Sequence, residues 1–115
     1  MTHIMKKATL TLIVFSLLAN VSMPANAGAE IRGAPSCGDW VTDHREKGIL
    51  FIGDTNWLMG FLSGIAYSSH QDFIKETTNE SLYLWVDNFC QANPHKNLGD
   101  AGNALAKKLI KEKHL

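Results

Sequence analysis

Several residue patterns that build active sites are missing from this chain of 115 residues. Lys and Arg together number 11, the same as Asp and Glu, and no basic patch suited to nucleic acid occurs along the sequence. There is no glycine-rich loop of the kind that cradles phosphates. The histidines form neither a His-x-x-x-His pair nor a Cys/His zinc spacing. We therefore predict that the chain binds neither nucleic acid nor a metal ion and holds no cofactor.

Residues 1–27 have the composition of an export signal. Lys6 and Lys7 precede an apolar stretch over residues 8–19, and small residues at Ala25 and Ala27 match the preference of signal peptidase. The apolar stretch is shorter than the roughly 20 residues that span a bilayer. We predict a signal peptide cleaved near Ala27 and a mature form that is not embedded in a membrane. An uncleaved anchor is the alternative.

Candidates for catalysis are equally few. Asp72 and Glu76 lie four residues apart and could share a surface, but carboxylates in a polar segment are far more often solvated than catalytic. A nucleophilic Cys/His pair would need a reduced thiol, which an exported protein does not favour. We expect no catalytic residues and predict that the chain is not an enzyme.

The chain has only two cysteines, Cys37 and Cys90. In a small exported domain such a pair predicts one disulfide and an oxidising compartment. Closing a loop of this length is worth about 4 kcal/mol in the chain-entropy model. Since small domains have a total stability of roughly 5–15 kcal/mol, this bond could decide whether the domain stays folded.

The first helix of the mature chain is expected after a flexible lead-in over residues 28–35. It would run from about Cys37 to Lys47, with Ser36 as N-cap and Asp39 completing a pair that resembles a capping box. Gly48 is predicted to end it.

The second helix is expected from Asp54 or Thr55 to about Ser69, with a broad apolar face. The apolar run of residues 49–52 before it could be an extended segment or a packed loop. Gly60 and Gly64 lie one turn apart, which predicts close packing of another helix there. A helix of this length and mixed composition is too short to span a membrane.

Two more helices are expected after a polar loop over residues 68–78. The third helix is expected to begin at Thr77 or Thr78, where Thr77 with Glu80 predicts a capping box, and Pro94 ends that helix. The fourth begins near Asn97 and is capped with Asp100. Together, residues 36–115 are predicted to form a single all-α domain, a compact bundle of about four helices stapled by one disulfide.

Two features could contact a partner. Trp40, Trp57 and Trp85 are core anchors or, where partly exposed, interface residues. The polar connection between the third and fourth helices is rigidified by Pro94 and anchored by Cys90, and rigidly held loops often carry binding residues. It consists of Asn93, Pro94, His95, Lys96 and Asn97. A plain helix–helix turn is the alternative reading of this segment.

A series of motifs resembles the Rap/Tai family of type VI secretion immunity proteins. The resemblance covers almost all of the chain from Ser36 to about Leu109, in matching order and spacing. The matching segments are Cys37-Gly38-Asp39-Trp40, residues 57–64, residues 84–94, Asn97-Leu98 and Asp100-Ala101.

The resemblance implies an exported, all-helical, disulfide-bearing protein of the bacterial periplasm. Members of this family bind peptidoglycan-cleaving amidase toxins delivered by neighbouring cells and occlude the active-site cleft, often as dimers. We therefore expect an amidase toxin as partner, a possible homodimer, and either residues 93–97 or the loop over residues 68–78 as the contact.

Two alternatives remain open at the level of sequence. One is a small periplasmic acid-stress chaperone, similar to the Hde type, whose histidines would charge below about pH 6.5. The other is an orphan interaction domain of envelope or conjugation machinery.

Overall fold

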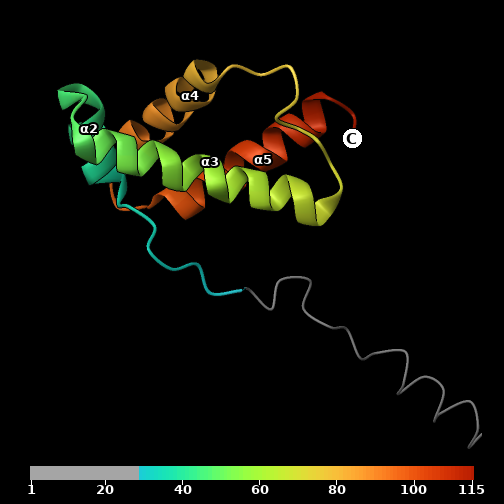
Figure 1. Cartoon of the computed structure of the whole chain (residues 1–115), viewed down its shortest axis with the longest axis horizontal. Helices are drawn as coiled ribbons and strands as arrows, with labels where there is room; N and C mark the ends of the chain where they lie inside the picture. Colours follow the sequence, from blue (N-terminus) through green and yellow to red (C-terminus); the bar gives the residue numbers. More distant parts are fainter. Residues whose placement is uncertain (1–28) are drawn as a thin grey trace, which may run out of the picture. The chain divides into compact units, whose positions relative to one another are not determined.

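The computed structural model of this chain describes residues 29–115, so the predicted signal peptide and its cleavage point lie outside the described residues. Residues Ile31–Leu115 form a compact unit. Its elements are four α-helices with no strand among the described residues: α2 (Cys37–Glu46), α3 (Ile49–Ser69), α4 (Asn79–Ala92) and α5 (Leu98–Glu112) (Figure 1). The prediction of an all-α bundle stapled by one disulfide is confirmed.

The helix α2 begins where it was predicted to begin and ends one residue early. The Ser36 side chain accepts a hydrogen bond from the Asp39 amide at 3.0 Å, which caps the helix. At the other end Lys47 takes the left-handed conformation (φ 52°) and donates its amide to the Asp43 carbonyl. Gly48, predicted to end this helix, instead has extended backbone and is the N-cap of α3.

The apolar run of residues 49–52 is helical, so both readings of it as an extended segment or a loop were wrong. It forms the first turn of α3, and Gly53 lies inside the helix. The reason is tertiary: the Phe51 ring packs against Trp40 and Tyr83 at centroid distances of 6.0 and 6.1 Å. These contacts offset the helical cost of a glycine, about 1 kcal/mol.

This early start changes what the length of α3 allows. The helix has 21 residues, and by length and composition it is long and apolar enough to cross a membrane, the one such helix in residues 29–115. The prediction that this helix is too short and too mixed in composition to span a membrane was therefore wrong on both points. In the folded unit, Leu58 and Leu62 of α3 are fully buried, and the helix packs against α2 and α5.

The close helix contact predicted at Gly60 and Gly64 is absent there. A Cβ added to either glycine would meet nothing within 4 Å. The close approach lies on α5 instead, where a Cβ on Gly102 would come within 2.7 Å of Phe61 Cδ1. The glycine that allows α3 and α5 to pack closely is thus Gly102 of α5, not a glycine of α3.

The remaining helix ends follow local hydrogen bonding. Thr78, rather than Thr77, caps α4 by accepting from the Ser81 amide at 3.2 Å, so the predicted pair of Thr77 and Glu80 is not the cap. The hydroxyl of Thr77 accepts from Lys113 Nζ at 3.0 Å. The predicted capping of α5 by Asn97 and Asp100 is confirmed, and it takes the form of a capping box, since each side chain accepts a hydrogen bond from the other residue's amide at 3.1 Å.

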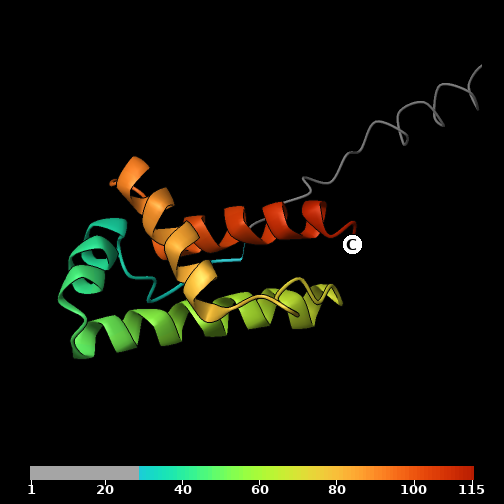
Figure 2. The same ribbon diagram turned by 90° about the horizontal axis from the view of Figure 1, so that it is seen from above.

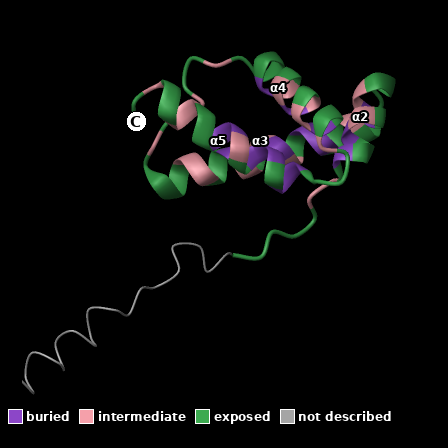
Figure 3. Cartoon of the chain, turned by 180° about the vertical axis from the view of Figure 1, so that it is seen from behind, coloured by how far each residue is buried: buried purple, intermediate pink, exposed green. Residues whose placement is uncertain are grey.

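The core lies where the four helices meet (Figure 3). In Figure 2, α3 and α5 extend side by side and α4 runs obliquely to them. Phe73, in the segment predicted to be a polar loop, is also fully buried. The fully or nearly fully buried apolar side chains are Cys37, Trp40, Leu58, Leu62, Phe73, Leu82, Val86, Cys90, Leu98, Ala101, Leu105 and Ala106.

Candidate functional site

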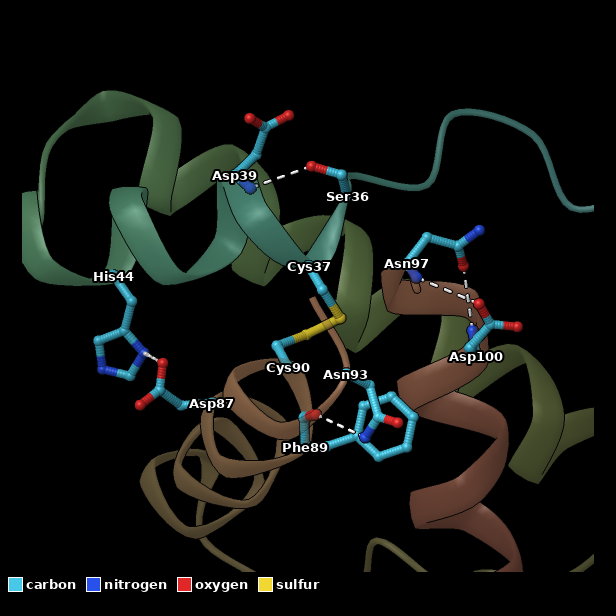
Figure 4. The surroundings of a disulfide bond; sticks show 10 residues. All are labelled: Ser36, Cys37, Asp39, His44, Asp87, Phe89, Cys90, Asn93, Asn97 and Asp100. Carbon is cyan, nitrogen blue, oxygen red and sulfur yellow. Dashed lines mark hydrogen bonds and ion pairs between the residues drawn. A yellow bond between two sulfur atoms is a disulfide. The ribbon is translucent and has the colours of Figure 1, made fainter. Parts of the chain in front are cut away.

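The predicted disulfide joins the first residue of α2 to the end of α4. Cys37 and Cys90 are bonded, their Cα atoms lie 4.8 Å apart, and both side chains are fully buried (Figure 4). The bond thus ties two helices whose cysteines are 53 positions apart in sequence. The connection over residues 93–97 follows directly after this anchor.

Backbone hydrogen bonds fix the 93–97 connection against the segment that leads into α2. The Cys37 amide donates to the Lys96 carbonyl at 2.9 Å, and the Leu98 amide donates to the Pro35 carbonyl at 2.9 Å. Ser36 and Asn97 form an isolated antiparallel bridge between these two bonds. The disulfide and this short ladder hold the connection from two sides.

Three of the five candidate side chains have structural roles. Asn93 Nδ2 donates to the Phe89 carbonyl at 2.9 Å, and Asn97 caps α5 (Figure 4). Lys96 Nζ lies 5.5 Å from the centroid of the Phe89 ring, a cation–π contact. Pro94 and His95 are exposed between these anchored positions. Lys96 and Asn97 are exposed as well, so a partner that approached the connection would meet all four residues.

A hollow of about 400 Å³ lies between α2 and α4, one turn from the same connection. His44 Nδ1 lies 3.5 Å from Asp87 Oδ1 (Figure 4). Gln91 Nε2 donates to Asp87 Oδ2 at 2.6 Å. The lining is completed by Val41 and Arg45. This polar surface offers an imidazole, a guanidinium and a carboxylate to a protein partner. Sequence analysis did not identify this surface. The only signal for it in the sequence is the four-residue spacing of Asp87 and Gln91.

Two carboxyl groups are buried where α2 meets α3. Asp43 and Asp54 are 9 % and 8 % exposed, and Asp54 Oδ2 has no hydrogen-bond partner. Burial, followed by the hydrogen bond and charge of Asp43 and by the charge of Asp39, together raise the pKa of Asp54 to about 7. At neutral pH Asp54 is therefore near its titration point.

The other sequence candidates are placed as follows. Trp40 is fully buried, whereas Trp57 and Trp85 are half-buried and stack on Phe61 and Phe89 at centroid distances of 5.1 and 5.5 Å. Asp72 and Glu76 are both exposed in the connection between α3 and α4. Within residues 29–115, no group of three or more His, Cys, Asp or Glu side chains is arranged to hold a metal ion.

No family model, no curated protein and no solved structure matches this chain.

Proposed function

We propose that this chain is an exported immunity protein that binds a type VI secretion peptidoglycan amidase toxin and occludes its active site. The proposal takes its partner from the resemblance of the motif series to the Rap/Tai family. The observation that carries it is the 93–97 connection, held by the Cys37–Cys90 disulfide and two backbone hydrogen bonds. A compartment that permits disulfides, such as the periplasm, is compatible with this bond.

The physical argument that residues 93–97 contact the toxin is that this connection is already ordered before binding. A segment already fixed in its bound shape loses little conformational entropy when a partner binds. Pro94 and His95 are exposed at its tip and are polar or rigid, which suits insertion into the wet cleft of a hydrolase. The hollow beside Asp87 would widen the contact along α4.

The buried carboxyl pair, Asp43 and Asp54, does not support the alternative of an acid-stress chaperone. Such a chaperone must lose its compact form as the pH falls. A carboxyl whose pKa is raised in the folded state stabilises that state at low pH, and Asp54 therefore opposes acid unfolding. We accordingly retain the toxin-binding proposal.

The experiment pairs the protein with an amidase toxin encoded beside it. His95→Glu changes an exposed side chain without touching a structural hydrogen bond, and we expect it to weaken inhibition of the amidase on the order of 10-fold or more, as a central contact would. Lys107→Glu, on the exposed surface of α5, is the matched control and should leave inhibition unchanged. The proposal fails if no adjacent toxin binds the protein and a strain lacking it survives every such toxin.

A further inference from the structure

The fully buried ring of Trp40 contacts three other rings where α2, α3 and α4 meet. The centroid of the Trp40 ring lies 5.6 Å from that of His44. The rings of Phe51 and Tyr83 each lie 6.0 Å from it. These three side chains are half-buried, so each keeps part of its surface in solvent while Trp40 supports its buried side. We call His44, Phe51 and Tyr83 the aromatic wall.

The aromatic wall lines a surface hollow of about 300 Å³. The Phe51 ring meets Tyr83 at 78° and a centroid distance of 6.1 Å, and it meets His44 at 41° and 5.1 Å. Rings inclined at such different angles can surround a guest from several sides. Leu84 adds an apolar contact to the lining. Because small-molecule sites have volumes of roughly 300–1,000 Å³, this hollow suits a small solute.

Two charged side chains of opposite sign complete the lining of the hollow. Lys47 comes from the end of α2 and Glu80 from the first turn of α4. Neither side chain forms an ion pair within residues 29–115, so both charges remain available to a ligand. A ligand with one charge would be attracted by one of these side chains and repelled by the other. The lining therefore favours a ligand that carries both a positive and a negative group.

We propose that this hollow binds a small zwitterion with a quaternary ammonium group, such as glycine betaine. The faces of aromatic rings attract cations, and a methylated ammonium is favoured there because it is less strongly hydrated than an ordinary ammonium. The methylated cation lies against Phe51 and Tyr83 beside Glu80, and the carboxylate of the ligand pairs with Lys47. The proposal does not depend on toxin binding, since no residue of the 93–97 connection lines the hollow.

The test is a titration of the purified, isotope-labelled protein with glycine betaine, followed through the NMR signals of the tryptophan side chains. We expect a saturable shift of the Trp40 indole signal, because Trp40 contacts every ring of the aromatic wall. Trp57 and Trp85 stack on other rings outside this cluster, and their signals should stay unchanged. A Trp40 signal that does not move, or equal shifts of all three signals, overturns the proposal.

Two further ligands separate the charge of the solute from its shape and its source. The anion tert-butylacetate has the shape of glycine betaine with carbon in place of the charged nitrogen, and it should bind on the order of 10-fold more weakly. Equal affinities overturn the proposal, because the hollow would then recognise only apolar surface. Phosphatidylcholine vesicles present the same methylated cation on a lipid. If the protein binds these vesicles and glycine betaine gives no shift, a membrane is the occupant and the proposal fails.

Variants of the lining test the assigned contacts. Tyr83→Leu removes one ring of the aromatic wall and should weaken the binding of glycine betaine on the order of 10-fold. The matched control is Trp85→Leu, which removes a half-buried ring of the same helix outside the hollow and should leave the affinity unchanged. An unchanged affinity for Tyr83→Leu overturns the proposal.

Lys47→Gln distinguishes a ligand contact from a general loss of structure. It should weaken the binding of glycine betaine but not that of choline, which has the same cation and no carboxylate. Misfolding would weaken the binding of both ligands. An unchanged affinity for glycine betaine, or equal losses for the two ligands, contradicts the pairing of Lys47 with the carboxylate and overturns the proposal.

Discussion

At the scale of single residues, Asp54 has the most unusual environment of the ionisable groups. Its carboxyl group is buried beside Asp43, and the two acids meet where α2 turns into α3. No pattern in the sequence marks this pair, since Asp43 and Asp54 lie on different helices and become neighbours only through folding. The protonated form of Asp54 can donate to Asp43, whereas two charged carboxylates at this position repel each other.

The pH dependence of stability follows from this raised pKa. Because the folded state holds the proton more tightly than the unfolded chain, the contribution of Asp54 is fully present below pH 4 and is lost as the pH rises to about 7. Asp54→Asn removes this dependence. We expect the variant to gain stability over the wild type between pH 5 and pH 8, by up to about 4 kcal/mol.

Urea unfolding at pH 5 and pH 8 measures this gain. Asp72→Asn, an exposed carboxylate in the connection before α4, is the control and should shift stability equally at both pH values. If the free energy of unfolding differs between wild type and Asp54→Asn by the same amount at pH 5 and pH 8, the raised pKa of Asp54 is contradicted.

At the scale of elements, features set by local chemistry were predictable and those set by tertiary contacts were not. The capping box of Asn97 and Asp100 and the end of α4 before Pro94 depend on residues within one turn, and both were predicted correctly. The first turn of α3 depends on the contacts of Phe51 with distant rings. Phe73 sits in a polar stretch, so its burial could not be read from periodicity.

The packing of α3 on α5 gives a prediction at the same scale. Gly102→Ala would place a methyl group 2.7 Å from the Phe61 ring, and the overpacking should cost roughly 1–3 kcal/mol. Gly60→Ala meets no neighbour and should instead stabilise the helix by about 0.5–1 kcal/mol. Thermal unfolding of the two variants checks the opposite signs. A Gly102→Ala variant as stable as the wild type would contradict this prediction and show that the Phe61 ring moves aside freely.

At the scale of the whole molecule, the disulfide connects stability to the candidate binding surface. It was predictable because the chain has two cysteines, whereas the ladder of Pro35, Cys37, Lys96 and Leu98 joins backbone groups that no side-chain pattern reveals. The positions of Pro94 and His95 therefore depend on the bond between Cys37 and Cys90. Loss of the bond should cost roughly 2–4 kcal/mol of stability.

The binding of the proposed partner, an amidase toxin encoded beside this chain, to oxidised and reduced protein tests the central claim most directly. Titration calorimetry at a temperature where the reduced form is still folded, verified by circular dichroism, would give both dissociation constants. The account predicts tight binding of the oxidised form and weaker binding of the reduced form, because reduction frees the 93–97 connection from its anchor at Cys90. Equal affinities, or no binding by the oxidised form, would contradict it.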